Sequence, residues 1–298
     1  MSAGTAVLNI GLVLLLSPLF EGLMRKLKAV IHSRKGPPII QPYLDILKLL
    51  GKEDIRVTQD ILFRIAPMAA LACIMVAALV TPMGAKTPAM AGDFIVWIYF
   101  ISMSAVAVTL GAFATRNPYA YVGSSRELMT LLTAEPVVLI ALITAAVKSQ
   151  SLIFGDMATW QLSEGPAVSM IGAGITFLLA LQASASRLPF DIPEAETEIM
   201  EGAFIEQSGP RLALYRIAKY AKQLILAAVL VQVFVPWPKI ELTSLAVVVN
   251  LAKILVVLLI VGVIECVNPR LRIDQSMNYF ARVAFVALAA LALAVVGA

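Results

Sequence analysis

Long apolar stretches alternate with short polar segments along the whole chain. A helix of about twenty predominantly apolar residues is long enough to cross the hydrocarbon core of a bilayer. Eight such stretches occur, with approximate bounds 4–24, 61–82, 93–114, 127–147, 166–186, 212–235, 242–264 and 276–297. No polar linker is long enough to separate domains. We therefore predict one all-α integral membrane domain over residues 1–298, with eight transmembrane helices.

The first connection is the longest, and it carries an amphipathic pattern. The Gly-Pro-Pro sequence at 36–38 ends any preceding helix, and Pro42 can begin a new one that continues to about residue 51. The leucines of this segment fall on one side: Leu44, Leu47 and Leu50 or Leu49. Such a helix tends to lie in the membrane interface. It either anchors the loop or forms a basic platform for a cytoplasmic partner.

Positive charge is distributed unevenly among the connections. Nineteen of the 23 Lys and Arg residues lie in or next to the first, third, fifth and seventh connections. Three lie in the second, fourth and sixth connections, and Lys253 lies within the seventh span. Because cytoplasmic loops carry an excess of Lys and Arg, we predict that the odd connections are cytoplasmic and that both termini face outward.

Composition excludes several classes of protein. The chain is 60% hydrophobic and only 14% charged, whereas soluble domains average about 25% charged residues. It has two cysteines in separate spans, Cys73 and Cys266, and one histidine, His32. No familiar spacing for a metal, an iron–sulfur cluster or haem is present, and no Ser-His-Asp set is recognisable. We therefore predict no catalytic residue, no metal site and no cofactor in this chain, so a redox centre must lie in another polypeptide.

The fifth connection, 187–209, is the most acidic segment. It holds six carboxylates: Asp191, Glu194, Glu196, Glu198, Glu201 and Glu206. If the segment is helical, Asp191, Glu194, Glu198 and Glu201 share one face, where each raises the pKa of its neighbours. Two interpretations are open. The segment is either a solvated acidic loop, or a row of carboxylates that passes protons or binds a cation.

Two glutamates occur within the fourth span, Glu127 near its cytoplasmic start and Glu135 about two turns deeper. Pro136 follows directly and removes one backbone hydrogen bond of the helix. Ionisable groups within a span are costly and normally face a bundle interior or a wet cavity. Glu135 is therefore a functional candidate. Glu127 is either a second candidate or an interfacial side chain that pairs with Arg126.

Lysines form a second group of candidates within the spans. Lys222 ends a basic stretch at 215–222, which we expect to face the acids of the fifth connection and to lower some of their pKa values. Lys253 stands alone in the seventh span and requires a carboxylate partner, a lowered pKa or water, as in proton relays. Glu265 lies near the cytoplasmic end of that span and is expected to be interfacial. Glu21 also lies near the inner end of a span, so its role is ambiguous from sequence.

Two long motifs resemble those of one protein family. The run RLPFDIPEAETEIMEG…EQSG in the fifth connection is similar to the R-x-P-F-D-x-P-E-A-E-x-E-L-x-x-G-x-x-x-E-Y-S-G run of NuoH, a membrane subunit of complex I. Residues 34–53 resemble its R-x-G-P…Q-P-x-x-D-x-x-K-L-L-x-K-E run. The family also includes the membrane subunits of energy-converting NiFe hydrogenases and formate hydrogenlyases. The resemblance extends over essentially the whole chain, since eight spans with outward termini fit it too.

Departures from the NuoH motifs favour the hydrogenase branch. The R-x-G-P-N-x-x-G-P loop of the quinone-reducing branch is shortened here to RKGPP, and Gln207 replaces the Tyr of E-Y-S-G. Glu201 precedes Gly202 where a small residue is usual. The short loop disfavours a quinone pocket.

This resemblance implies a multi-pass subunit of an ion-translocating oxidoreductase in a prokaryotic plasma membrane. The implied partners are the large NiFe subunit and the small iron–sulfur subunit of a hydrogenase, antiporter-like membrane subunits and ferredoxin, but no nucleic acid. The NiFe centre and [4Fe–4S] clusters would lie in those partners. We assign partner docking to residues of the first connection: Arg34, Lys35, Gly36, Pro37, Gln41, Asp45 and Lys48.

The resulting hypothesis is ion coupling without bond-making chemistry in this chain. The acids of the fifth connection would change their proton affinity, Glu127, Glu135 and Lys222 would continue the path, and Lys253 would pass it to a neighbouring subunit. Three alternatives remain: a quinone oxidoreductase subunit that forms the quinone site, a stand-alone cation/proton transporter, and a passive membrane anchor.

Overall fold

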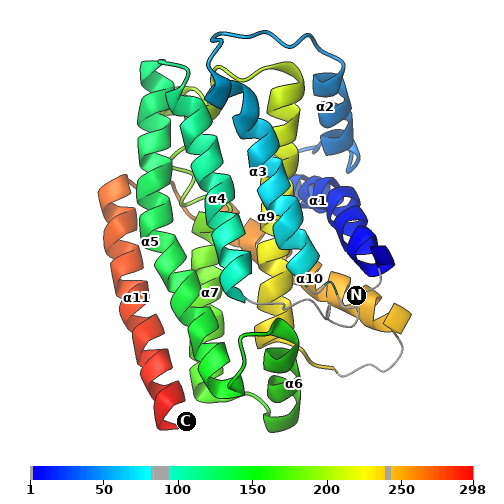
Figure 1. Cartoon of the computed structure of the whole chain (residues 1–298), viewed down its shortest axis with the longest axis vertical. Coiled ribbons are helices and arrows are strands. Elements are labelled where there is room, and N and C mark those ends of the chain that lie inside the picture. Colours follow the sequence, from blue (N-terminus) through cyan, green and yellow to red (C-terminus); the bar gives the residue numbers. More distant parts are fainter. Residues whose placement is uncertain (1–2, 82, 84–93, 239–242, 298) are drawn as a thin grey trace.

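The computed structural model describes residues 3–81, 83, 94–238 and 243–297, and every regular element within these ranges is a helix (Figure 1). In chain order the elements are α1 (Ala3–Ile31), α2 (Gln41–Leu50), α3 (Ile61–Val80), α4 (Phe94–Phe113), α5 (Pro118–Ser149), α6 (Phe154–Glu164), α7 (Val168–Ser184), α8 (Glu196–Ile199), the short 3₁₀ helix η1 (Gly202–Phe204), α9 (Gly209–Phe234), α10 (Thr243–Val267) and α11 (Ile273–Val296).

Six helices in the described ranges are long and apolar enough to cross a membrane, namely α3, α4, α5, α9, α10 and α11. They overlap six of the eight predicted spans, although α5 begins nine residues before its predicted span. This overlap confirms the all-helical membrane class. The remaining predicted spans, 4–24 and 166–186, also form helices, α1 and α7. α7 is apolar but only 17 residues long. The total of eight spans and the outward termini therefore stay predictions.

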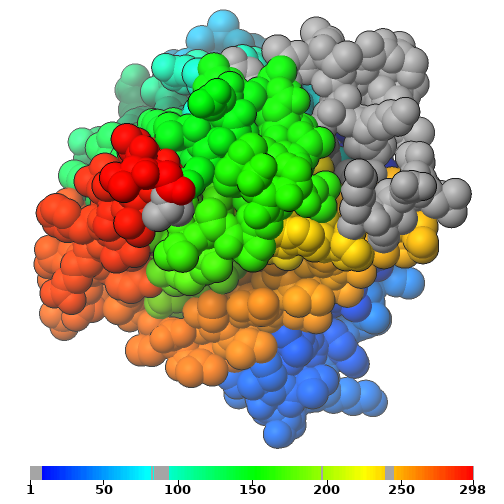
Figure 2. All heavy atoms as spheres, turned by 90° about the horizontal axis from the view of Figure 1, so that it is seen from below, coloured from blue at the N-terminus to red at the C-terminus, as the bar shows by residue number. Residues whose placement is uncertain are grey.

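Most of the long helices run along one axis, whereas α1 and α10 cross it steeply. Figure 1 shows α3, α4, α5, α7, α9 and α11 side by side along the long axis. Viewed from below in Figure 2, α10 (orange) extends across the molecule, with the blue N-terminal part of the chain along its edge. α1, α10 and α9 contact one another. This tilted pair therefore closes one side of α9.

α9 lies at the centre of the fold. It contacts α1, α2, α3, α6, α7 and α10, and 78% of its most apolar 18-residue stretch is buried within the protein. Alanines at several of its positions are almost fully buried, including Ala213, Ala221 and Ala227. Small side chains let helix backbones approach closely in a membrane, where packing replaces the hydrophobic effect. α9 can therefore bring polar residues of several helices together near its first half.

The acidic connection does not form the predicted helix, so the row of four acids on one helical face is wrong. Only α8 and η1 are helical within 187–208. Pro189 and Pro193 interrupt helical hydrogen bonding, and Met200, Glu201 and Gly202 all have positive φ values, between 51° and 68°. Gly202 is required here because a Cβ at this position would lie 2.2 Å from the carbonyl oxygen of Pro193.

Two further differences concern amphipathic helices. α2 forms where it is expected, but its buried side consists of Pro42, Ile46 and Leu49. Of the predicted apolar residues, Leu49 is buried, whereas Leu44, Leu47 and Leu50 are exposed and face away from the rest of the protein. α6, in the fourth connection, was not predicted; it is anchored by the fully buried Phe154, whose ring meets Trp97 edge to face.

Candidate functional site

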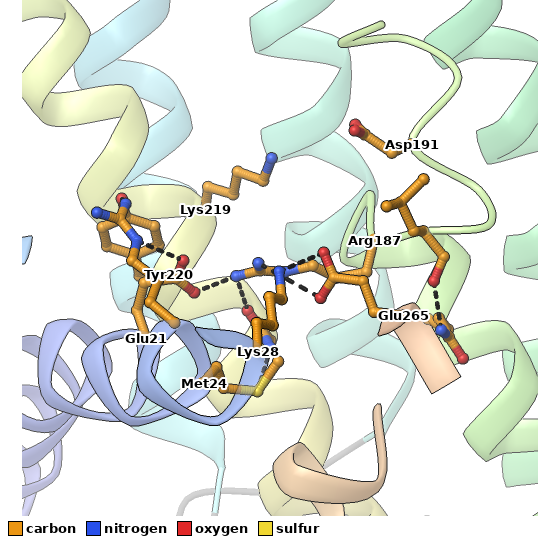
Figure 3. Close-up of polar contacts among 12 residues, drawn as sticks. Glu21, Met24, Lys28, Arg187, Asp191, Lys219, Tyr220 and Glu265 are labelled. Carbon is orange, nitrogen blue, oxygen red and sulfur yellow. Dashed lines mark hydrogen bonds and ion pairs between the residues drawn. The ribbon is translucent and has the colours of Figure 1, made fainter. Parts of the chain in front are cut away.

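A buried cluster of ion pairs joins α1, α9, α10 and the first residue of the acidic connection (Figure 3). Arg187 is only 7% exposed, and it donates hydrogen bonds to Glu21 of α1 and, at 2.7 Å, to the Oε1 atom of Gln223 of α9. Its Nη1 atom lies 3.9 Å from the Oε2 atom of Glu265 of α10, which also pairs with Lys28 of α1. Arg187 therefore holds the start of the acidic connection against three helices.

Electrostatics keeps this cluster charged in spite of burial. Burial alone would lower the pKa of Arg187, but the charges of Glu21 and Glu265 outweigh burial and raise its pKa above the ordinary value. Arg187 is therefore always a cation here. A buried charge of this kind is stable only while its partners remain in place.

Sequence reasoning missed this cluster. Glu265 pairs with Lys28 and lies near Arg187, with its side chain only 9% exposed. Glu21, whose role is ambiguous from sequence, is only 6% exposed. The sequence does contain a signal for this cluster. Arg187 is the first residue of the acidic motif, and Glu21 and Glu265 lie at the ends of two spans on the same predicted side of the membrane.

The same cluster continues outward to α2 through Arg25. The Arg25 guanidinium donates to Glu21 at 3.1 Å, to the Tyr220 hydroxyl at 2.8 Å and to Asp45 of α2 at 3.1 Å. Burial alone would raise the pKa of Asp45, but hydrogen bonds from Gln41 and Arg25 outweigh it and lower that pKa. The carboxylate of Asp45 therefore fastens α2 to α1.

Five of the six acids of the connection contact a cation or an amide from another part of the chain. Asp191 pairs with Arg270 at 3.2 Å, Glu198 with Arg126 at 2.8 Å, Glu201 with Arg216 at 3.8 Å and Glu194 with Lys219, while Asn117 donates to Glu206. The side chain of Glu196 lies outside the described residues. The basic residues of α9 therefore face two of the acids, as predicted, through Arg216 and Lys219.

Asp191 and Glu198 differ in proton affinity because their surroundings differ. Burial, followed by repulsion from Glu194, raises the pKa of Asp191 to about 6. The hydrogen bond from Arg126 lowers the pKa of Glu198, which is otherwise exposed. Titration near neutral pH beside other charged groups is typical of functional sites. Lys219 of α9 lowers the pKa of Asp191, as expected, but burial and Glu194 outweigh this effect.

Three cavities lead from the acidic connection toward the middle of α5. The outer cavity, of about 190 Å³, is lined by Glu201, Arg216, Glu194 and Lys219, among others. The middle cavity, of about 50 Å³, shares Glu194 and Lys219 with the outer one and adds Glu127 and Lys222. The inner cavity, of about 10 Å³, shares Glu127 and Lys222 with the middle one and ends at Glu135.

Water fits this series of cavities. About 10–15 Å³ of such volume holds one water molecule, provided that polar partners are present. The outer and middle cavities can therefore hold several waters, and the inner one about one. The inner end is also polar, because the Ser102 hydroxyl of α4 donates to Glu135 of α5. The arrangement suits the transfer of a small cation or a proton from group to group.

Lys253 is not part of this arrangement. Its ammonium group donates to the carbonyl oxygens of Val235 and Pro236, both at 3.1 Å, and to Asn250 at 3.4 Å. Those carbonyls follow the end of α9, where unpaired helix carbonyls commonly accept bonds from lysine. The structure thus places Lys253 at the far end of α9 from the acidic connection.

The residues assigned to docking divide into two groups. Arg34, Lys35, Pro37 and Lys48 are exposed, whereas Gln41 and Asp45 are half-buried and bonded to each other. Gly36 packs on α1, where a Cβ would lie 2.4 Å from that of Ala29. The exposed group forms a basic surface together with exposed Ile39, Ile40, Leu44 and Leu47. Within the described residues, no three His, Cys, Asp or Glu side chains could hold a metal ion.

Comparison with known proteins extends over nearly the whole chain. The profile of the family described as NADH dehydrogenase matches residues 4–297. Hydrogenase-4 component C of Escherichia coli (strain K12) is 31% identical over 85% of this chain and 84% of its own length. Formate hydrogenlyase subunit 4 of the same organism is 30% identical over 92% of this chain and 94% of its own length.

Two further similarities come from other complexes. An NADH-quinone oxidoreductase subunit of Geobacter metallireducens is 32% identical over 85% of this chain and 83% of its own length. Among solved structures, a chain of the membrane-bound sulfane sulfur reductase, an archaeal respiratory membrane complex, matches with a TM-score of 0.89. That chain is 28% identical, and the match covers 97% of this chain and 98% of that one.

Proposed function

Because this chain belongs to the NuoH-like NADH dehydrogenase family, we propose that it is the membrane subunit of an energy-converting, ferredoxin-linked NiFe hydrogenase. In this role it docks the peripheral hydrogenase arm and couples hydrogen evolution or oxidation to the translocation of protons or sodium. The complex lies in a prokaryotic plasma membrane, and this chain crosses it eight times with both termini outside. Its relatives are subunits of hydrogenase and complex I-like respiratory complexes.

The observation that carries this proposal is the series of three cavities that links the acidic connection to Glu135. Every cavity is lined by carboxylates together with Lys or Arg, and neighbouring cavities share such residues. Glu135 is 14 positions from the end of α5 at Ser149, or about 21 Å at 1.5 Å per residue. A carboxylate at this depth costs free energy, and such residues within spans mark ion or proton pathways.

Coupling would begin at the docking surface of the first connection. The large NiFe subunit and the small iron–sulfur subunit would bind Arg34, Lys35, Pro37 and Lys48, and electron transfer there would alter the charge beside the acidic connection. Asp191 is suited to respond, because its pKa of about 6 lies near neutral pH. Moving one charge against 100 mV takes about 2.3 kcal/mol, and a shift of two pKa units supplies about 2.7 kcal/mol.

From the acidic connection the ion would pass to Glu127 and then to Glu135. An antiporter-like membrane subunit would receive it there. Ferredoxin would supply electrons through the partner subunits, which would also hold the NiFe centre and the [4Fe–4S] clusters. Hydrogenase chemistry is favoured by the two hydrogenase-type relatives from Escherichia coli and by the shortened RKGPP loop.

Replacing Glu135 by glutamine tests the pathway. In the purified complex or in everted membrane vesicles, we expect Glu135→Gln to abolish hydrogen-driven ion uptake while hydrogen turnover continues, because glutamine neither binds nor releases a proton. Glu164→Gln is the matched control, since Glu164 is exposed at the end of α6. Normal ion uptake by the Glu135 variant would remove this residue from the pathway and would favour a passive anchor.

A second candidate keeps the same membrane role but changes the redox chemistry. The likeness to a sulfane sulfur reductase chain and to an NADH-quinone oxidoreductase subunit favours a reductase of sulfur compounds or quinones. Nickel in the co-purified complex, with hydrogen evolution from reduced ferredoxin, would support the hydrogenase. Sulfane sulfur or quinone reduction without nickel would support the second candidate. Ion flux by this chain alone in liposomes would indicate a stand-alone transporter.

A further inference from the structure

The inner cavity is lined by a lysine that has no fixed partner in the described part of the chain. Lys222 makes no hydrogen bond and no ion pair with any residue in the ranges that the structure describes, although it lines both the middle and the inner cavities. Lys219, one turn earlier on α9, is by contrast fixed by Glu194. The charge of Lys222 acts on both Glu127 and Glu135. One ammonium group therefore serves two carboxylates.

Oxygen atoms of several side chains line the same cavity as this ammonium group. Glu127, Thr130 and Glu135 of α5 line the inner cavity together with Ser184 at the end of α7. The hydroxyl oxygen of Ser184 is buried and has no hydrogen-bond partner in the described protein. A charged ammonium group carries three donors, and carboxylates and hydroxyls accept from it. The oxygens that a small metal cation would need thus line a cavity that already holds a cation of the protein itself.

Sodium and protons place different demands on such a cavity. Hard metal cations are held by a shell of several oxygen atoms, and sodium sites in transporters commonly use carbonyls of unwound helices. Here α5 and α9 are continuous helices past the cavity, so most of their carbonyls are already bonded. A cavity of about 10 Å³ has room for about one water. A proton needs only that water and two carboxylates.

We infer that the inner cavity passes protons and excludes sodium, and that Lys222 is the residue that determines this selectivity. The inference rests on the proposed function and specifies its cargo. The Lys222 ammonium group occupies the position that a sodium ion would take and repels a second cation. It also stabilises whichever carboxylate has released its proton, as the proton moves from Glu127 through water to Glu135.

Carbodiimide labelling of the purified complex tests this selectivity at two carboxyl groups of this chain. Dicyclohexylcarbodiimide reacts with protonated carboxyl groups, and mass spectrometry of the peptides that contain Glu127 and Glu135 gives the labelling rate of each. For the native chain we expect the same rate with sodium chloride and with choline chloride. For Lys222→Gln we expect sodium to slow labelling at least tenfold, because the vacated position and its oxygens then hold the metal ion.

Two further variants complete the experiment. Lys222→Arg keeps the charge and should stay insensitive to sodium. Lys148→Gln should behave as the native chain, since Lys148 lies at the other end of α5, 6.0 Å from the centre of the Trp160 ring. Sodium protection of the native carboxylates would overturn the inference. Equal rates with and without sodium in Lys222→Gln would overturn the role of Lys222.

Vesicle assays provide an independent measurement if the reagent reaches neither carboxyl group. Hydrogen-driven acidification by Lys222→Gln vesicles should then become sensitive to sodium, whereas that of Lys148→Gln vesicles should not. Equal sensitivity would again refute the inference. Failure of the proposed pathway remains distinguishable, because it would be seen as normal ion uptake by Glu135→Gln, whatever the effect of sodium on labelling.

Discussion

Replacement of Arg187 by methionine would test whether the buried ion pairs hold the acidic connection in place. Methionine is unbranched and fills much of the volume of the arginine stem, but it removes the guanidinium group that contacts Glu21, Gln223 and Glu265. Arg187 and Glu21 have side-chain exposures of only 8% and 6%. Both side chains also line the outer cavity, so water can replace only part of the lost contacts.

The expected cost follows from the partners that remain. Removal of one member of a buried ion pair typically costs about 3–5 kcal/mol, because the other charge stays buried without compensation. In this variant Glu21 keeps Arg25 at 3.1 Å and Glu265 keeps Lys28. We therefore expect the lower end of the range, about 3 kcal/mol, which is roughly a hundredfold change in the unfolding equilibrium constant.

Detergent-induced unfolding of the purified protein, followed by tryptophan fluorescence, measures this free energy. The matched control is Arg216→Met, which removes an arginine from a 3.8 Å pair with Glu201 whose side chains are 34% and 43% exposed. Such surface pairs contribute about 0–1 kcal/mol. If the two variants lost the same stability, the reasoning that burial makes Arg187 structurally decisive would be refuted.

Two other outcomes are expected. The pKa of Asp191 is raised from 3.8 to about 6, so the folded state binds the proton of this carboxyl group more tightly than the unfolded state does. Native stability therefore falls as pH rises from about 4 to 6. Asp191→Asn should remove this pH dependence and raise the free energy of unfolding by about 3 kcal/mol above pH 7. Unfolding curves between pH 4 and pH 8 measure it, and parallel profiles for both proteins would contradict it. Gly123→Ala would place a Cβ 2.7 Å from the Gly202 Cα and should cost about 1–3 kcal/mol through overpacking, whereas Gly11→Ala, with nothing within 4 Å, should not. Equal unfolding free energies for these two variants would show that η1 moves away from α5 freely.

The positions of the membrane helices were predictable because apolar length is a local property of the sequence. α3, α4, α5, α9, α10 and α11 coincide with predicted spans, since an uninterrupted run of apolar side chains forms a helix in lipid wherever it occurs. The boundary of α1 was less predictable. Its helix continues to Ile31, seven residues past the predicted span, and in this extension Arg25 and Lys28 pair with Asp45 of α2 and Glu265 of α10.

The candidate site was predictable only in part. Glu127, Glu135 and Lys222 could be selected from sequence because a charge within an apolar span is conspicuous, and the structure brings all three to one cavity. The conformation of the acidic connection could not be predicted from helical spacing. Its ion pairs with Arg126, Arg216, Lys219 and Arg270 come from three separate parts of the chain, and they override the local periodicity.

The sequence by itself therefore determined the class of protein, the positions of most spans and the family, since each depends on composition or on contiguous motifs. Only the tertiary structure decided which charges are partners. Glu21 and Arg187 are 166 positions apart, and they meet because α1 and α10 tilt across α9 and enclose the start of the acidic connection. Whether a carboxylate is fixed by a buried arginine or left free beside water depends on that packing, and helix packing is not encoded in any single stretch of residues.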